Sequence, residues 1–196
     1  MKKAASAAAE KVVLTFTKPQ EFRKWLHKHH AQSTGIWVRY FKKASGKKGI
    51  TYAEALDEAL CYGWIDSLAN TYDEESYIQK FTPRKAKSVW SKRNRVHVAR
   101  LIKEKKMMPA GLAHVKAAKK DGRWEQAYDG SSTMKIPDDF LKELKKDKKA
   151  TAFFETLNRT NLYAIGWRLQ TAKKPETRAK RMHAILAMLK AGKKFH

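Results

Sequence analysis

Residues 51–68 read TYAEALDEALCYGWIDSL, and this stretch decides the fold class because a helix pattern passes directly into a strand pattern. Thr51 and Glu54 have the spacing of a capping box, in which side chains and backbone amides pair reciprocally at a helix start. Apolar residues then recur at helical spacing as far as Leu60. Gly63 is suited to the left-handed conformation that ends many helices, and the residues after it predict a strand. The stretch therefore predicts a helix followed at once by a strand.

The flanking sequence supplies further elements of both kinds. Residues 35–41 are rich in β-branched and aromatic side chains and predict a strand, and residues 76–81 predict another, reached through the acidic turn at 72–75. Residues 17–20 read TKPQ, which has the form of a second capping box with proline in the first turn, and the apolar pattern after it predicts a helix to about His30. Further helices are predicted at 91–106, 109–121, 137–146, 150–157, 160–170 and 175–191.

These elements predict an α+β protein with a helix-rich main domain that holds a small β-sheet, followed by a small helical C-terminal domain. The polar run at 129–133 interrupts the pattern and marks the boundary. The predicted organisation is a flexible tail at 1–14, a main domain at 15–130, a linker at 131–136 and a helical domain at 137–196.

Positive charge dominates the sequence. The 196 residues carry 43 Lys and Arg against 19 Asp and Glu, a formal net charge of +24. Residues 1–80 hold 13 basic against 9 acidic residues, whereas residues 81–196 hold 30 against 10. A charge of this size attracts polyanions, so nucleic acid or another polyanion is the first class of partner to consider.

Other features narrow the class of protein. Cys61 is the only cysteine, so the chain has neither an internal disulfide nor a zinc site of paired cysteines. The first residues resemble a signal peptide, but Glu10 interrupts them, and no stretch has the length and apolarity of a membrane span. We therefore expect a cytoplasmic protein. The histidines at positions 27, 29 and 30 lie near a helix end without further ligands, so neither a metal nor a cofactor is predicted.

The basic run at 81–94, FTPRKAKSVWSKRN, is the first candidate binding segment. A serine at 88 or 91 is suited to cap a helix whose first turn is cationic, which opposes the helix dipole and indicates a site for an anion. Trp90 is either a stacking face for such a ligand or a core residue, and for this residue alone we favour the core. The basic side chains are expected to stand outward in water and to bind an anion. The alternative is that they form a solvated surface without a ligand. The residues singled out here are Arg84, Lys85, Lys87, Trp90, Arg93 and Asn94.

Two other stretches carry candidates. Asp66 follows Trp64 in the strand and either faces Arg84 across a pocket or, as we favour, makes a structural pair or cap. Cys61 is interpreted as an inert core thiol, because the spacing places no base beside it. The C-terminal basic run offers a second anion patch or, equally, a solvated face. Its residues are Lys173, Lys174, Arg178 and Arg181.

Four runs in this order resemble the YdeI/OmpD-associated bacteriocin-protection family: ALCYGWIDS, KFTPRKAKSVWSKRN, MMPAGLAHVKAAKKDGRWEQAYD and TAKKPETRAKRMHAILAML. The resemblance extends from about residue 16 to residue 192, and the last run is similar to that family's compact helical domain. It implies a bacterial protein linked to an outer-membrane porin and to tolerance of bacteriocins or cationic peptides, with no catalytic residues to carry over. The residues that match by resemblance, without assigned chemistry, are Trp64, Asp66, Arg84, Trp90, Asn94, Lys174, Pro175, Glu176 and Arg178.

Three functions follow as hypotheses. The first, which we favour, is a binding protein that engages an anionic partner through a basic surface. The second is a stress-tolerance factor that acts through a protein partner, as the resemblance implies. The third is an enzyme on a small anionic substrate, which lacks a visible nucleophile and base. The predicted binding residues are Trp64, Asp66, Arg84, Lys85, Lys87, Trp90, Arg93, Asn94, Lys174, Arg178 and Arg181; none is assigned as catalytic.

Overall fold

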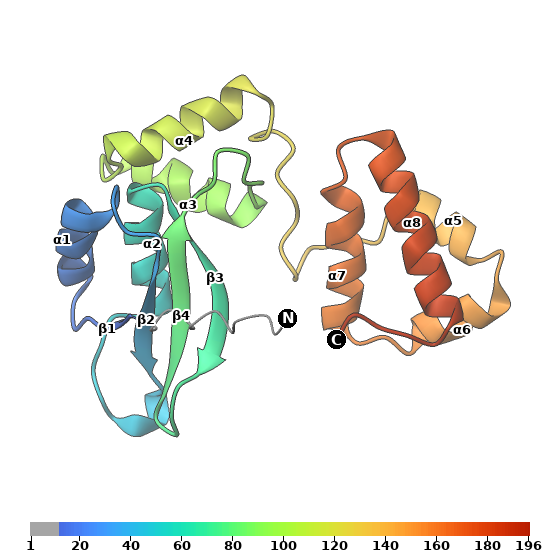
Figure 1. Cartoon of the computed structure of the whole chain (residues 1–196), viewed down its shortest axis with the longest axis horizontal. Helices are drawn as coiled ribbons and strands as arrows, with labels where there is room; N and C mark the ends of the chain where they lie inside the picture. Colours follow the sequence, from blue (N-terminus) through green and yellow to red (C-terminus); the bar gives the residue numbers. More distant parts are fainter. Residues whose placement is uncertain (1–11) are drawn as a thin grey trace, which may run out of the picture. The chain divides into compact units, whose positions relative to one another are not determined.

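The computed structural model describes residues 12–196 (Figure 1), which form helices and a four-stranded sheet, so the predicted α+β class is confirmed. The chain divides into two compact units. The N-terminal unit runs to Ser88 and includes Val96–Asp121. The C-terminal unit consists of Val89–Arg95 and Gly122–His196. No helix in the described part of the chain is both long and apolar enough to cross a lipid bilayer.

The sheet of the N-terminal unit has the strand order β1-β2-β4-β3. Its strands are β1 (Val13–Thr15), β2 (Ile36–Phe41), β3 (Trp64–Thr71) and β4 (Ser76–Pro83). β1 pairs parallel with β2, and the other two pairings are antiparallel. The three strands expected from the sequence are confirmed, but β1 was missed because three residues are too few to show an alternating pattern.

Two helices build the core beside this sheet: α1 (Pro19–His29) supplies aromatic side chains, and α2 (Tyr52–Cys61) supplies small and aliphatic ones. The ring of Phe22 lies 5.7 Å from that of Phe81 on β4, edge to face, and the ring of Trp25 lies 5.7 Å from that of Trp64 in the same manner. Aromatic pairs in this geometry stabilise a core beyond the area that they bury.

The start of α2 has the capping box that the sequence predicts. The Thr51 side chain accepts a hydrogen bond from the Glu54 amide, while the Glu54 carboxylate accepts one from the Thr51 amide. Gly63 beyond the helix end has φ +74°, so the chain turns there into β3. The second predicted capping box is wrong: α1 begins after Lys18 without a side-chain cap, and Thr17 donates to Glu21 instead of capping the helix.

The next two helices are α3 (Lys92–Lys103) and α4 (Pro109–Lys120). Ser91 caps α3 as expected, because its hydroxyl accepts from the Asn94 amide at 3.1 Å. Val98 and Leu101 are buried as predicted, but Ile102 is 41% exposed, which corrects the expectation that it points inward. The residue after Leu101 is turned by about 100° around the helix axis and so leaves the buried face.

The C-terminal unit is a helical bundle of α5 (Asp138–Leu144), α6 (Lys148–Glu155), α7 (Arg159–Gln170) and α8 (Pro175–Lys190). All four helices fall where the sequence predicts them, within a few residues at each end. Their buried side chains form one apolar core, made of Phe140, Leu144, Ala150, Ile165, Leu169, Ile185 and Leu189.

Residues 89–95 belong to the C-terminal unit through contacts with residues 122–129. The ring of Trp90 lies 4.9 Å from that of Trp124, and the Tyr128 amide donates to the Trp90 carbonyl at 2.9 Å. The Lys92 amide donates in turn to the Tyr128 carbonyl at 2.8 Å. This short parallel bridge orders the beginning of α3.

Candidate functional site

The basic run at 81–94 does not form the exposed platform that its composition suggested. Arg84 is only 6% exposed, so the expectation that it stands outward is wrong; its amide donates to the Gly63 carbonyl at 2.9 Å, which places it against the turn between α2 and β3. Trp90 is 2% exposed and packs against Trp124, which confirms the core alternative. Neither Trp90 nor Arg84 therefore exposes a face on which a ligand could stack.

The remaining cations of this run divide between the two units. Lys85 and Lys87 are exposed residues of the N-terminal unit, and Arg93 is an exposed residue of the C-terminal unit. Two neighbours of Arg93 are neutralised within their own unit: the Lys92 ammonium lies 2.7 Å from Asp129, and the Arg95 guanidinium lies 3.3 Å from Glu125.

Asn94 is half-buried, and its backbone N–H donates to the Ser91 hydroxyl at 3.1 Å. The binding role predicted for this set stays a prediction.

The other candidates of the N-terminal unit also have structural contacts. Trp64 is 1% exposed, and its indole N–H donates to the His30 carbonyl at 3.2 Å. The Asp66 carboxylate accepts from the Tyr52 hydroxyl at 2.9 Å. Burial raises the pKa of the Cys61 thiol to about 11, which supports its interpretation as an inert core residue.

No group of three or more histidine, cysteine, aspartate or glutamate side chains suited to a metal ion occurs among residues 12–196.

The C-terminal basic run begins in the loop between α7 and α8 and continues into the first turns of α8. Lys174 is exposed and occupies the N-cap position, without a capping side-chain bond. Arg178 binds Asp139 through both of its terminal nitrogens, at 2.7 and 2.9 Å. Arg181 is half-buried and donates to the Arg168 carbonyl at 2.7 Å and to the Thr171 hydroxyl at 3.1 Å.

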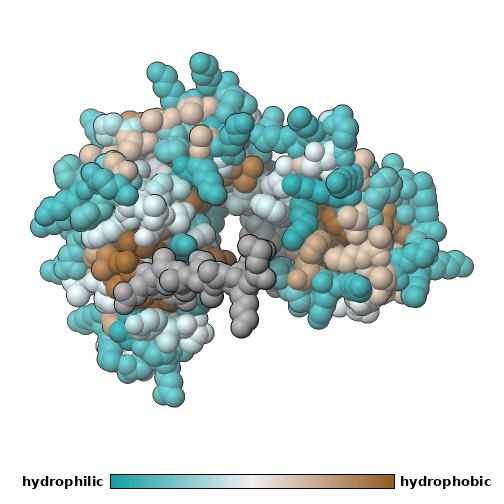
Figure 2. Space-filling view, in the orientation of Figure 1, coloured by the Kyte–Doolittle hydropathy of each residue, from teal (hydrophilic) through white to brown (hydrophobic). Residues whose placement is uncertain are grey.

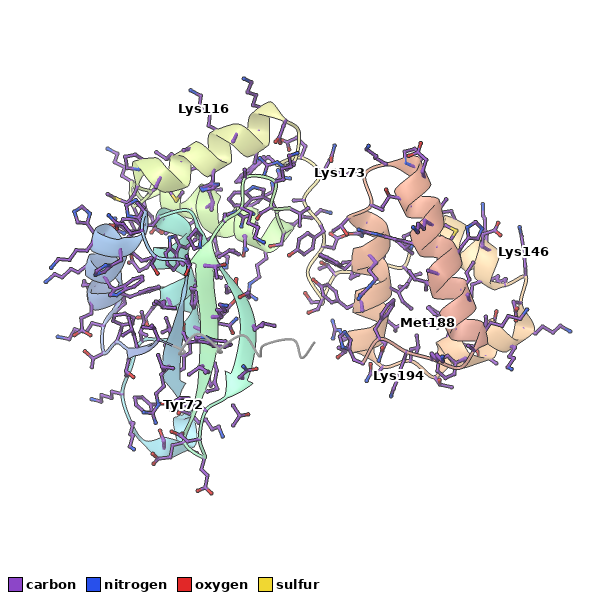
Figure 3. All side chains as sticks on the ribbon, in the orientation of Figure 1. Tyr72, Lys116, Lys146, Lys173, Met188 and Lys194 are labelled. Atoms are coloured by element: carbon purple, nitrogen blue, oxygen red, sulfur yellow. The ribbon has the colours of Figure 1, made fainter. Side chains whose placement is uncertain are left out.

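Arg181 opens onto a pocket of about 450 Å³, which we call the Arg168–Arg181 pocket. Most of its wall is apolar, and Met188, which Figure 3 labels on α8, is part of it. In Figure 2 the visible surface over α7 and α8 is correspondingly tan to brown, with hydrophilic residues around its edge. The lining residues are Trp167, Arg168, Arg181, Ala184, Ile185, Met188 and Phe195.

The two arginines of this pocket are a like-charged pair in partly apolar surroundings. Arg168 lies over the Phe195 ring, 3.8 Å from its centroid, and donates to the Ala164 carbonyl. Among the residues that the structure describes, no carboxylate lies within ion-pair distance of either guanidinium. Burial and, after it, the charge of Arg181 lower the pKa of Arg168, so each effect disfavours its cation. An anion placed between the two guanidinium groups would offset both the cost of burying the Arg168 cation and its repulsion by Arg181.

The sequence pattern indicated Arg181 but missed Arg168, Trp167 and Phe195. Arg168 is on α7, outside the basic run. Phe195 follows the last helix and is held by Asn161, whose side-chain oxygen accepts from the Phe195 and His196 amides at 3.0 and 3.1 Å. Asn161 is 1% exposed, and a buried polar residue inside an apolar helix pattern was the one available signal that a distant backbone segment docks there.

Comparison with known proteins divides the chain at nearly the same place as the structure. Residues 14–114 match the model of a family described as Domain of unknown function (DUF8412). Residues 133–192, which include α5 to α8, match the family described as Bacteriocin-protection, YdeI or OmpD-Associated. The resemblance inferred from the sequence is thus confirmed for the helical bundle. No curated protein and no solved structure matches this chain.

Proposed function

We propose that this protein binds an anionic partner. The premise is its family: the chain belongs to the DUF8412 family over residues 14–114 and to the bacteriocin-protection, YdeI or OmpD-associated family over residues 133–192. The partner site that we propose is the Arg168–Arg181 pocket, and its occupant is an acidic, partly apolar segment of another protein. The observation that carries this proposal is the pair of half-buried arginines in an apolar pocket without a carboxylate of their own unit.

Charge and shape both favour such an occupant. A carboxylate between Arg168 and Arg181 would gain charge-assisted hydrogen bonds from two guanidinium groups. An adjacent apolar side chain would fill the volume beside Ile185, Met188 and Phe195. The family description, which names association with another protein, favours a protein segment over other anions.

A labelled peptide tests the proposal. We expect a fluorescent peptide of alternating Glu and Leu to bind the full chain, as measured by anisotropy, and its Gln-for-Glu counterpart to bind far more weakly. Arg168→Met and Arg181→Met should each weaken binding by about ten-fold or more, since ten-fold corresponds to about 1.4 kcal/mol. Lys180→Met is the matched control, because it removes the same charge from an exposed position of α8 outside the pocket. Equal losses in Arg181→Met and Lys180→Met would refute the proposal.

Nucleic acid is the second candidate, favoured by the net charge. Each unit holds a formal net charge of +12, from 23 basic against 11 acidic residues in the N-terminal unit and 20 against 8 in the C-terminal unit. Binding of a DNA or RNA oligonucleotide through six or more phosphates would weaken by roughly 10³-fold between about 50 and 200 mM salt. Peptide binding in an apolar pocket should depend on salt much less steeply. A steep salt slope that every lysine substitution reduces equally would favour nucleic acid instead.

A further inference from the structure

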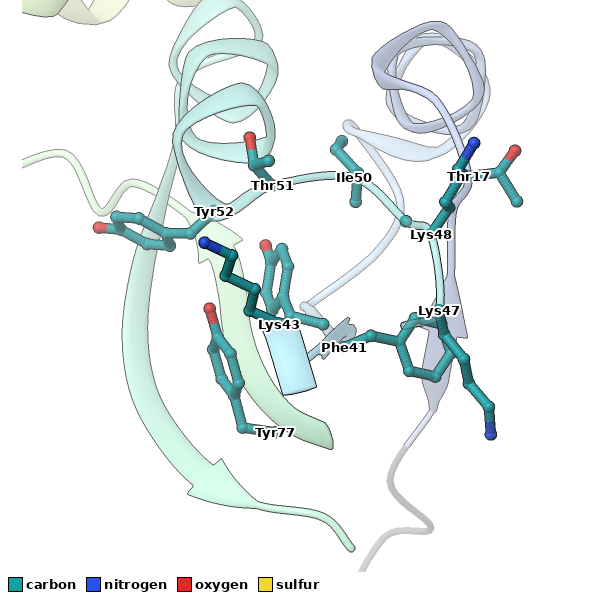
Figure 4. A pocket seen from close by; sticks show the side chains of 11 residues that line it. Thr17, Phe41, Lys43, Lys47, Lys48, Ile50, Thr51, Tyr52 and Tyr77 are labelled. Carbon is teal, nitrogen blue, oxygen red and sulfur yellow. The ribbon is translucent and has the colours of Figure 1, made fainter. Parts of the chain in front are cut away.

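A second pocket, of about 520 Å³, lies in the N-terminal unit where β2 and β4 meet the loop that leads into α2 (Figure 4). We call it the tyrosine–lysine pocket, because three tyrosines and three lysines contribute to its wall. Its volume is within the range of pockets that hold small molecules. The lining residues are Thr17, Tyr40, Phe41, Lys43, Lys47, Lys48, Gly49, Ile50, Thr51, Tyr52 and Tyr77.

Two lysines of one loop lie at this pocket, and Figure 4 shows their ammonium groups pointing apart, that of Lys43 on the side of Tyr52 and that of Lys48 on the side of Thr17. Lys43 and Lys48 are exposed, and within the described residues neither has an ion-pair partner. Lys47 differs, because it pairs with Glu75, and Figure 4 shows it pointing away from the other lining side chains. The loop ends at Thr51, so the first turn of α2 adds the positive end of a helix dipole. Glu54 is the carboxylate of that turn, and it is already held by the Thr51 amide and hydroxyl.

Tyr40 supplies an independent sign of a ligand. Its side chain lines the pocket and is 2% exposed, yet its hydroxyl has no hydrogen-bond partner in the part of the chain that the structure describes. Buried hydroxyl groups are nearly always satisfied in folded proteins, so an orphaned one marks a place where another polar group is expected. The Tyr40 ring stacks on Tyr77 with centroids 5.1 Å apart, which fixes its position in the wall.

The same surroundings keep that phenol protonated. Burial, together with the neighbouring Tyr77, Tyr52 and Asp66, raises the pKa of Tyr40 far above its ordinary value. The protonated Tyr40 hydroxyl can donate a hydrogen bond to a ligand oxygen.

We propose that the tyrosine–lysine pocket binds a small phosphate monoester, with the phosphate beside Lys43, Tyr40 and the start of α2. A phosphate is favoured over a carboxylate because its larger negative charge gains more from the Lys43 ammonium group, the Tyr40 hydroxyl and the positive end of the α2 dipole. The aromatic wall of Phe41, Tyr52 and Tyr77 receives the apolar body of the ligand. This site lies in the N-terminal unit and is independent of the function proposed for the Arg168–Arg181 pocket.

Calorimetric titration of the full chain with phenyl phosphate tests the inference, with benzoate as the carboxylate comparison. We expect phenyl phosphate to bind more tightly than benzoate. Lys43→Met should weaken binding by about ten-fold, as for the loss of one charge-assisted contact, and Lys48→Met should weaken it less. Tyr40→Phe should weaken it by roughly three-fold or more, while the melting temperature of the unliganded protein stays the same or rises, because the orphaned hydroxyl is gone.

Two controls make the outcome decisive. Lys24→Met removes an exposed charge of α1 outside the pocket and should leave the affinity within about two-fold. Arg181→Met should have no effect, which separates this site from the pocket of the C-terminal unit. The inference is overturned if phenyl phosphate does not bind at low millimolar concentration, if Lys24→Met costs as much as Lys43→Met, or if Tyr40→Phe leaves the affinity unchanged.

Discussion

At Gly111 the backbone of α4 passes so close to the end of α2 that a single added methyl group has no room. A Cβ atom there would lie 2.3 Å from the Cys61 carbonyl oxygen and 2.8 Å from that of Leu60. Both are backbone atoms and cannot turn aside. Gly166 in α7 is equally crowded, but a Cβ atom there would meet the side chain of Met134, which is flexible.

We therefore expect different costs for the same substitution at these two glycines. Gly111→Ala should lower the free energy of unfolding of the N-terminal unit by about 1–3 kcal/mol, as overpacking does. Gly166→Ala should cost much less, because Met134 can move and alanine is favoured over glycine in a helix by about 1 kcal/mol. Urea denaturation of both variants, followed by circular dichroism, measures the difference. Equal losses would mean that the approach of α4 to α2 is less rigid than the distances imply.

Among the elements, α2 and α6 show how much local sequence determines. The cap at Thr51, the helix after it and the turn at Gly63 depend on neighbouring residues, and all three were predictable. At α6 the Asp147 side chain accepts from the Lys149 and Ala150 amides, and it also pairs with Lys190 of α8. These partners hold the pKa of Asp147 below its usual value, the Ala150 amide most strongly.

The candidate sites were harder to predict for a physical reason. The burial of Arg84 depends on β4 ending beside the turn at Gly63, and the Arg168–Arg181 pocket depends on α7, α8 and the segment at Phe195 coming together. Such contacts join residues far apart in the sequence, which no local spacing encodes. Charge composition identified the right residue types but not which of them lie beside one another.

Asp147 gives α6 a dependence on pH that can be measured. A carboxylate whose pKa is lowered on folding stabilises the folded state above its unfolded pKa, here 3.8, and loses that contribution as the pH falls through its folded pKa. Asparagine is also a good N-cap but does not titrate. We expect wild type to exceed Asp147→Asn in stability at pH 7, and the difference to vanish as the pH falls below 3.8. Denaturation midpoints of both proteins across this range provide the test, and a constant difference would contradict it.

At the scale of the whole molecule, the charge of +24 opposes the compact state through self-repulsion. About half of the acidic residues make ion pairs within their own unit, such as Asp139 with Arg178 and Asp57 with Arg100. Each unit therefore keeps a large excess of exposed lysines, whose mutual repulsion is felt over the screening length of the solution.

Added salt should stabilise this protein. Screening at about 0.5 M sodium chloride shortens the range of repulsion well below the roughly 10 Å that holds at 0.1 M, so the urea midpoint should rise with salt. A variant with Lys145→Gln, Lys149→Gln and Lys180→Gln carries less charge on its C-terminal unit and should show a smaller rise. A midpoint that falls with salt would mean that attractive ion pairs outweigh the repulsion.

The lone thiol has a practical consequence for such experiments. Cys61 is 1% exposed and belongs to the N-terminal unit, while the C-terminal unit has no cysteine at all. A reagent that modifies free sulfhydryls can reach this atom only when α2 opens to solvent. The rate of modification therefore reports how often the N-terminal unit opens at α2. No engineered label is needed to follow that unit separately from the C-terminal unit.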